Sequence, residues 1–331
     1  MQETFRKVAD VFKKKDYFTI TSHQNIDGDG IGSALAVYFL LKGLNKKARV
    51  IYDAPVPYFY EFLPGVSFIE KFAGSDFKKE VLVVVDCSNL KRTGQIAETA
   101  GNYQIIVNID HHPDNQYFGN VNLVDPEAPS CSLLLYKLIK ENNFVLTREI
   151  ATSILTGIIT DTGNFQFVEM NTYLLEVLSE LTQQGASLSQ IIKHAFRYRK
   201  LEALRLLGRA LSKMEYDAER GIASIYVTQE DFKTTSAHED DTEGIVDYGL
   251  FIPGSRISVL FKETQPSYFK VSLRSQDDLN LLPIVHHFGG GGHEKAAGFK
   301  ITGNFETVKI QVLQFIRNYI DQELLTKKSA L

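Results

Sequence analysis

The sequence lacks several features that mark particular classes of protein. Its 331 residues include no tryptophan and only two cysteines, Cys87 and Cys131. Two cysteines cannot form the disulfide framework of a small secreted protein, and their spacing does not match a metal-binding pair. The scarcity of cysteine favours a reducing compartment, and we expect a cytoplasmic protein.

A long apolar segment is also absent. The longest apolar run, IGSALAVYFLLKGL, is interrupted by Lys42, whereas a membrane-spanning helix needs about 20 apolar residues. The N-terminal stretch MQETFRKVADVFKKKD has no apolar core of the signal-peptide kind. Phe5, Val8 and Phe12 recur there at helical spacing. We therefore predict an amphipathic helix packed on the first domain, in preference to a membrane-surface helix.

Positive charge is not in excess. The formal net charge is −4, which excludes general attraction for polyanions and argues against long duplex DNA as a ligand. Hydrophobic residues make up 44% and charged residues 23%, as in ordinary globular proteins. The length is enough for two domains. The oligomeric state stays open, and the sequence is compatible with a homodimer.

Apolar strands alternate with helices through the first half of the sequence. Alternation of this kind predicts an α/β fold with a parallel sheet and helices on both faces. A helix is expected over residues 29–44, and strands are expected over residues 17–22, 47–53, 80–88 and 103–112.

The second half changes character twice. It is mainly helical from about residue 131 to residue 211, and strands then return with a helix near residues 241–251. We predict a catalytic domain over residues 1–188, a helical connector over 189–216, and a smaller mixed α/β domain over 217–331.

Acidic and imidazole groups follow the predicted strands and one helix. They are His23, Asp27, Asp29, Asp86, Asp110, His111, His112 and Asp161. Each has an ordinary alternative when taken singly. Asp27, Asp29 or Asp161 could cap a helix, Asp86 could end a strand in a turn, and His112 could be a surface histidine.

Jointly these residues predict a metal centre. Parallel strands bring their carboxyl ends to one edge of the sheet, where the carboxylates would repel one another unless cations lie between them. Two divalent ions sharing a bridging carboxylate would offset that repulsion. Mixed carboxylate and imidazole ligands suit Mn²⁺, Fe²⁺, Co²⁺ or Zn²⁺ more than Mg²⁺ or Ca²⁺. We expect Gly28 and Gly30 to let the backbone turn sharply, so that Asp27 and Asp29 face different ions.

The segments HQNIDGDG, VVVDCS, NIDHHPDN and GIITDTGNF resemble the four motifs of the DHH phosphoesterases, which are named after the Asp-His-His triplet. FGGGGHEKAAGF is similar to the glycine-rich signature of the associated C-terminal domain, DHHA1. The short chain resembles the nanoRNase/pAp phosphatase branch of the family more than RecJ-type exonucleases, which usually carry additional domains.

The resemblance implies a role for each residue. His23 and Asp27 would hold the first ion, Asp29, His111 and Asp161 the second, and Asp86 would bridge both. Asp110 would orient the histidines. His112 would contact the scissile phosphate and protonate the leaving oxygen. The ions, most readily Mn²⁺ with Mg²⁺, Co²⁺ or Fe²⁺ as alternatives, would activate a hydroxide that attacks phosphorus.

The glycine run is interpreted as part of a substrate site. Gly289, Gly290, Gly291 and Gly292 leave backbone N–H groups open to an anion, although a bare glycine run is more often a flexible turn. The resemblance assigns this loop, His293 and the strand KVSLRSQ to the substrate end away from the chemistry. Arg274 is the best candidate for a phosphate clamp, because guanidinium matches phosphate bidentately, and Ser275 could assist.

The implied activity is hydrolysis of short oligoribonucleotides to 5′-mononucleotides, of pAp to AMP, or of both. The nearest alternative is a phosphodiesterase for cyclic di-AMP or pApA, which no residue here separates from the first. An inorganic pyrophosphatase lacks the GGGGH signature and ranks low. A non-catalytic nucleotide-binding module would be expected to lack a metal ligand, and none is missing.

Overall fold

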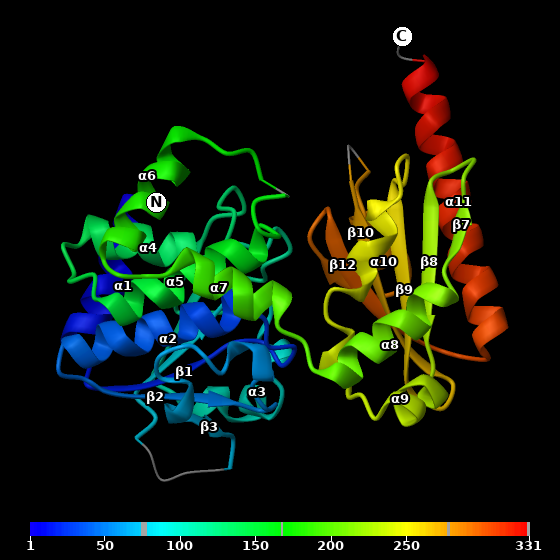
Figure 1. The fold of residues 1–331 in the computed structure, drawn as a ribbon. Coiled ribbons are helices and arrows are strands. Elements are labelled where there is room, and N and C mark those ends of the chain that lie inside the picture. The colour runs from blue at the N-terminus through cyan, green and yellow to red at the C-terminus, as the bar shows by residue number, and fades with distance from the viewer. Residues whose placement is uncertain (74–77, 167, 277–278, 330–331) are drawn as a thin grey trace. The chain divides into compact units, whose positions relative to one another are not determined.

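A computed structural model describes residues 1–73, 78–166, 168–276 and 279–329. The chain forms two compact units, Met1–Tyr198 and Arg199–Leu331, each with its own sheet and hydrophobic core (Figure 1). The predicted α/β class is confirmed. The predicted connector 189–216 contains the division between the units and is helical over most of its length.

The first unit is built on a six-stranded parallel sheet with the strand order β3-β2-β1-β4-β5-β6. β4 reads Val-Leu-Val-Val-Val and is buried throughout, as expected of a parallel strand covered on both faces. The strands are β1 (Tyr17–Thr21), β2 (Lys47–Tyr52), β3 (Ile69–Lys71), β4 (Val81–Val85), β5 (Ile105–Asp110) and β6 (Val121–Val124). The edge strands β3 and β6 were not predicted, because three or four residues are too few to show a periodic pattern.

Helices cover both faces of this sheet, as predicted. α1, α2, α4 and α5 lie over one face and the short α3 over the other (Figure 1). Phe5, Val8 and Phe12 of α1 are buried in the core, so the amphipathic N-terminal helix packs on the first unit as expected. The α-helices are α1 (Gln2–Lys14), α2 (Gly28–Gly43), α3 (Gln95–Thr99), α4 (Cys131–Glu141), α5 (Arg148–Asp161), α6 (Thr172–Gln183) and α7 (Leu188–Ile192). Shorter turns are η1 (Tyr58–Tyr60), η2 (Val66–Phe68), η3 (Leu90–Thr93), η4 (Ala100–Asn102) and the π-helical η5 (Lys193–Arg197).

Glycines let α2 and α5 approach each other closely. A Cβ atom at Gly32 of α2 would lie 2.4 Å from the carbonyl oxygen of Ser153 on α5. A Cβ atom at Gly157 of α5 would lie 2.4 Å from Oδ1 of Asp29 on α2. No side chain fits at these distances, so the close contact requires glycine. The contact places the beginning of α2 beside the end of α5, where Asp161 is located.

The second unit contains a six-stranded mixed sheet with the order β11-β12-β10-β9-β8-β7, in which only β8 and β9 pair in parallel. One face packs on α10 and α11 and the other on α8. The strands are β7 (Glu215–Asp217), β8 (Ile222–Val227), β9 (Ile257–Gln265), β10 (Tyr268–Ser275), β11 (Gly291–Gly292) and β12 (Ala296–Thr302). The helices are α8 (Leu201–Ser212), α9 (Gln229–Thr235), η6 (Glu239–Thr242), η7 (Ile245–Phe251), α10 (Leu282–His287) and α11 (Phe305–Ser329).

The helix predicted near residues 241–251 is present, but it is divided and of the 3₁₀ type. Two 3₁₀ segments, η6 and η7, occupy this stretch. Gly244 separates them because it adopts a left-handed backbone conformation, with φ of 79°, which a right-handed helix cannot include. Across the described residues, no helix is both long and apolar enough to cross a membrane.

We expect Gly32→Ala to lower the free energy of unfolding by about 1–3 kcal/mol, because the added methyl group would overlap the Ser153 carbonyl and push α2 from α5. Gly43→Ala is the matched control. It lies at the end of the same helix with no atom within 4 Å of its Cβ position, so stability should be equal or higher. Urea denaturation compares the two, and an equal loss in both would contradict the packing explanation.

Asp231 supplies a pH-dependent prediction in the second unit. Its side chain is 2% exposed and forms ion pairs with Arg209 and Lys213. Burial by itself raises the pKa of Asp231, but hydrogen bonds from Lys213, Thr228 and Arg209 outweigh burial and lower the pKa to about 2. An unfolded aspartate titrates near 3.9. The ionised carboxylate therefore stabilises the fold above about pH 4, and this contribution is lost as the pH falls toward 2.

We accordingly expect Asp231→Asn to lower the free energy of unfolding by about 1–2 kcal/mol at neutral pH. The difference from the unaltered protein should shrink between about pH 4 and pH 2. Chemical denaturation at a series of pH values measures this difference in the free energy of unfolding. Glu230→Gln, at the exposed neighbouring position, is the control. A difference that stayed constant down to pH 2 would contradict the ion-pair origin.

Candidate active site

Polar side chains from β1, β4 and β5 meet at one edge of the first sheet. His23 and Asp27 follow β1, Asp86 follows β4, and β5 leads into Asp110-His111-His112. Because β4 lies between β1 and β5 in the parallel sheet, Asp86 is central. It is also buried, with 2% of the residue exposed.

A first cluster joins the loop after β1 to Asp86. The Nε2 atom of His23 lies 3.3 Å from Oδ2 of Asp27 and 3.4 Å from Oδ2 of Asp86. One potential ligand atom from each of the three residues lies within 4.8 Å of the others. His23 and Asp86 are buried while Asp27 is exposed, so the cluster can be reached from solvent.

A second cluster joins β5 to α2 and α5. The Nε2 atom of His111 lies 3.2 Å from Oδ2 of Asp161 and 3.8 Å from Oδ2 of Asp29. It also lies 3.5 Å from Oδ1 of Asp86. Asp86 thus presents Oδ2 to the first cluster and Oδ1 to the second, which is the geometry of a carboxylate that bridges two ions.

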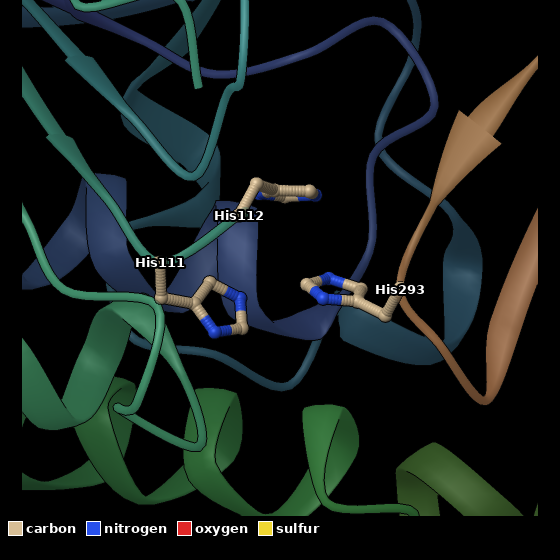
Figure 2. Close-up of side chains that lie close together, drawn as sticks. All are labelled: His111, His112 and His293. Atoms are coloured by element: carbon tan, nitrogen blue, oxygen red, sulfur yellow. The ribbon is translucent and has the colours of Figure 1, made fainter. Parts of the chain in front are cut away.

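His112 is held by a chain of buried hydrogen bonds. Figure 2 shows its ring beside that of His111 at the end of β5, with ring centroids 5.2 Å apart. The Nδ1 atom of His112 lies 2.8 Å from Oδ1 of Asp110. The amide of Asn115 donates to Oδ2 of Asp110 at 2.5 Å, and its oxygen accepts from Asn108 at 2.9 Å. Asp110 therefore orients His112, while its own orientation depends on Asn115.

The pKa values indicate that nearby positive charge would stabilise the two clusters. Burial would lower the pKa of His23, but the carboxylates of Asp27 and Asp86 outweigh burial and raise it to about 10. Burial, and next the charge of Asp86, raises the pKa of Asp29 to about 7. Burial also raises the pKa of Asp161 well above its usual range. Asp29 and Asp161 are thus costly to ionise unless cations are near. Burial acts in the same direction on Asp86, but hydrogen bonds from His111 and His23 outweigh it and lower the pKa of that carboxyl well below its usual range.

The donor set fits divalent metal ions. The two clusters combine buried carboxylate oxygens with imidazole nitrogens, the mixture that manganese, iron, cobalt and zinc accept. Each cluster offers three residues, and Asp86 faces both. The residues that the sequence motifs singled out thus form clusters that could bind metal ions.

The capping and metal-binding interpretations of Asp27 and Asp29 are both compatible with the structure. Asp27 caps α2 because its Oδ1 accepts from Gly30 N at 2.8 Å, while its Oδ2 faces His23. Asp29 accepts from the backbone N–H groups of Cys131 at 2.7 Å and Ser132 at 2.9 Å. These are the first residues of α4. A carboxylate oxygen has more than one lone pair, so a capping carboxylate can still bind a metal ion.

The role predicted for Gly28 and Gly30 needs correction. Neither glycine adopts a left-handed backbone conformation, so no sharp turn requires them. Close packing requires glycine at both positions. A Cβ atom at Gly28 would lie 2.3 Å from Oγ1 of Thr160. One at Gly30 would lie 2.7 Å from Oγ of Ser22. The unusual backbone belongs to Asp86, whose φ of 51° is uncommon for a residue with a side chain.

Two residues beside the centre were not predicted from the sequence. Asn115 positions Asp110, and its only sequence signal is its place shortly after the Asp-His-His triplet. Arg92, in the 3₁₀ segment η3 after β4, lies with Nη1 3.4 Å from Nε2 of His112. A lone arginine in so short a segment carries no pattern that sequence analysis could use.

In the second unit, two residues predicted to bind substrate lie on opposite faces of the same strand. Arg274 lies on the half-buried face of β10, with Nε 3.4 Å from Oδ1 of Asp247. Ser275 points to the opposite face, is fully buried, and donates to the carbonyl of Leu279 at 2.7 Å. Its hydroxyl is therefore engaged in the fold. Ser272 shares the face of Arg274, since side chains alternate along a strand.

The glycine run is more ordered than a flexible turn. Gly291 and Gly292 form the short strand β11, paired with Gly298 and Ala297 of β12. A Cβ atom at Gly290 would lie 2.2 Å from the carbonyl oxygen of Gly298, so glycine is required by close packing. Gly289 has a left-handed φ of 73°. His293 follows in a tight turn, donating its backbone N–H to Ala296 at 2.8 Å.

Comparison with known families agrees with this geometry. The model of the DHH family N-terminal domain matches residues 17–158, and that of the DHHA1 domain matches residues 221–322. The first match contains HQNIDGDG, VVVDCS and NIDHHPDN and ends within GIITDTGNF, before Asp161, and the second contains FGGGGHEKAAGF. Each covers most of one structural unit.

Several known proteins are similar over nearly the whole chain. The bifunctional oligoribonuclease and PAP phosphatase NrnA of Thermus thermophilus is 31% identical over 95% of this chain and 94% of its own. The protein of the same name from Bacillus subtilis is 27% identical over 86% of this chain and 90% of its own.

Solved structures agree with the sequence comparisons. An exopolyphosphatase-related protein from Bacteroides fragilis is 27% identical and superposes with a TM-score of 0.88, covering 97% of this chain and 98% of that one. RecJ of Thermus thermophilus shares the fold with a TM-score of 0.56 and 14% identity, over 97% of this chain and 54% of RecJ. The chain described here therefore belongs to the DHH family and carries a DHHA1 domain.

Proposed function

We propose that this protein, a phosphoesterase of the DHH family, removes 5′-mononucleotides from short oligoribonucleotides and converts pAp to AMP with two divalent metal ions. The observation that carries the proposal is the position of Asp86, whose two carboxylate oxygens face two separate donor clusters. An arrangement of this kind serves in-line displacement at phosphorus, because two ions can act on the attacking and leaving oxygens.

The relatives support the choice of substrates. The similar proteins from Thermus thermophilus and Bacillus subtilis are named as oligoribonucleases and PAP phosphatases. The chain spans 94% of the first and 90% of the second, so the similarity covers nearly the full length of each. Short RNA, pAp and dinucleotides are accordingly the proposed ligands, and neither long duplex DNA nor a membrane is.

Six side chains are proposed to hold the metal ions. His23 and Asp27 would bind the first, Asp29, His111 and Asp161 the second, with Asp86 between them. Divalent ions at such a site make water a stronger nucleophile and offset negative charge on the phosphoryl oxygens. Mn²⁺ is the preferred ion for this donor set, with Mg²⁺, Co²⁺ and Fe²⁺ as alternatives. RecJ is described in complex with Mn²⁺ and with Mg²⁺.

His112, oriented by Asp110, is proposed to donate a proton to the leaving group. Nδ1 of His112 lies 2.8 Å from Oδ1 of Asp110, a contact that fixes the orientation of the ring. The Nε2 atom of His112 is then able to contact a phosphoryl oxygen and donate a proton to the leaving oxygen. Asn115 keeps Asp110 in place through its 2.5 Å hydrogen bond.

The second unit is proposed to bind the end of the substrate that does not react. Arg274 is the proposed phosphate ligand, with Ser272 as a neighbour on the same face of β10. The ordered glycine run Gly289–Gly292 and His293 are proposed to contribute backbone and imidazole donors. Ser275 supports this region from the buried side, through its bonds to the carbonyl groups of Leu279 and Glu294.

Hydrolysis of cyclic di-AMP or pApA is the principal alternative. It would use the same ions and the same two domains, so only the substrate distinguishes it. Inorganic pyrophosphatase and a non-catalytic binding module rank below both. All the ligands that the motifs imply are present and gathered at one edge of the sheet, which favours an active enzyme.

Substrate comparison with Mn²⁺ tests the proposal directly. We expect release of AMP or other mononucleotides from pAp and from an RNA pentamer, measured by chromatography. Cyclic di-AMP, pApA and pyrophosphate complete the panel. Cleavage of pyrophosphate alone would overturn the proposed function, and nucleotide binding without turnover of any substrate would favour the binding module.

Asp86→Ala tests the bridging role. We expect it to abolish hydrolysis of pAp and to reduce the number of bound Mn²⁺ ions, because both clusters lose an oxygen ligand. Metal content measured by mass spectrometry and turnover are the two readouts. Asp114→Ala, at an exposed carboxylate near the triplet, is the matched control and should change neither. Near-normal turnover in Asp86→Ala would disprove the two-metal assignment.

A further inference from the structure

Arg92 occupies a position beside the candidate active site that the motifs do not explain. It lies in η3, the short helical segment that follows β4 and Asp86. Its backbone carbonyl accepts a hydrogen bond from the N–H of Gln24 at 2.8 Å, which ties η3 to the loop carrying His23. Its Nη1 atom lies 3.4 Å from Nε2 of His112. The guanidinium is thus at the edge where the donor clusters meet.

The guanidinium is only partly used by the protein. Nη1 donates to Oγ of Ser88 at 3.2 Å and contacts His112. Across the described residues, no carboxylate forms an ion pair with Arg92, and neither Nε nor Nη2 has a protein acceptor. A guanidinium carries five N–H donors. Most of those of Arg92 therefore remain for an acceptor that the fold itself does not supply.

The missing acceptor has the chemistry of phosphate. A half-buried cation without a carboxylate partner is expensive unless a ligand completes its hydrogen bonds. The planar guanidinium fork matches two oxygens of one phosphate. His112, its neighbour at 3.4 Å, is the residue proposed to contact the scissile phosphate. One phosphate between the two side chains would satisfy both.

We propose that Arg92 is a further catalytic residue, whose guanidinium binds the non-bridging oxygens of the scissile phosphate together with His112. The inference rests on the proposed function, because it adds one group to the same site. In the reaction, water forms a bond to phosphorus and gives up one proton to solvent. The bond from phosphorus to the leaving oxygen breaks, and that oxygen takes a proton from His112. Arg92 transfers no proton and stabilises the charge that develops on the phosphoryl oxygens.

A purely structural role for Arg92 predicts a different result. If Arg92 served only to hold Ser88 or the η3 segment, its removal would lower stability and leave phosphate binding by the folded protein unchanged. The contact to Ser88 accounts for one donor nitrogen. The structural role therefore leaves Nε and Nη2 unexplained, whereas a phosphate ligand uses them.

Kinetics on pAp provide the first test. We expect Arg92→Ala to lower kcat/KM by about 10²–10³-fold, the usual cost of losing a donor to a developing oxyanion. Arg92→Lys should recover only part of this loss, because a point charge cannot bind two oxygens in the same plane. Added guanidinium ion should partly rescue Arg92→Ala and not the lysine variant. Lys91→Ala, at the exposed neighbouring cation, is the matched control and should stay within about twofold.

Equilibrium binding tests the role of Arg92 independently of the proposed function. Calorimetry with AMP and with inorganic phosphate should show at least tenfold weaker binding to Mn²⁺-loaded Arg92→Ala, with unchanged Mn²⁺ content. If the unaltered protein hydrolyses none of the tested nucleotides, this binding difference still tests Arg92. Equal affinity in the two proteins, or kcat/KM on pAp within threefold, would overturn the inference. If Arg92→Ala does not fold, Arg92→Lys and Arg92→Gln give the same comparison.

Discussion

Five carboxylates at one edge of the first sheet repel one another, and the surrounding structure is organised by the need to offset that repulsion. They belong to Asp27, Asp29, Asp86, Asp110 and Asp161. His112 lies 2.8 Å from Asp110, and His23 and His111 lie 3.2–3.8 Å from the other four. Asp110 is set apart because it serves His112, which leaves the other four to surround two separate positions. The division of one acidic edge into two clusters comes from Asp86, which directly follows β4, the strand between β1 and β5.

The scaffold keeps these groups in place by fixing the ends of its helices. Asp27 caps the start of α2, and Asp29 accepts from two N–H groups at the start of α4. Glycines along α2 and α5 remove the side chains that would otherwise separate Asp29 from Asp161. Asp27 and Asp29 are therefore positioned by backbone contacts that form as the core packs, whereas Asp110 is held by the side-chain amide of Asn115.

Strong periodic patterns and ordered motifs were sufficient to predict the class of fold, the buried central strands and the residues of both clusters. The pattern failed where segments are short. β3 and β6 have too few residues to alternate visibly, and a left-handed Gly244 divides what looked like one helix. Close contacts are also invisible in a sequence. For this reason Gly28 was assigned to a sharp turn, although close packing against Thr160 is what requires glycine there, and neither Asn115 nor Arg92 could be recognised.

The two clusters unite segments that are far apart in the chain, from His23 after β1 to Asp161 at the end of α5. Metal ions held there would act as cross-links, because each would close a long loop of the chain and reduce the conformational freedom of the unfolded state. Both cysteines are free, so the protein has no disulfide for this purpose. The ions that serve the chemistry would therefore also stabilise the fold of the first unit. Removal of metal would lower the stability of the first unit before it affected that of the second.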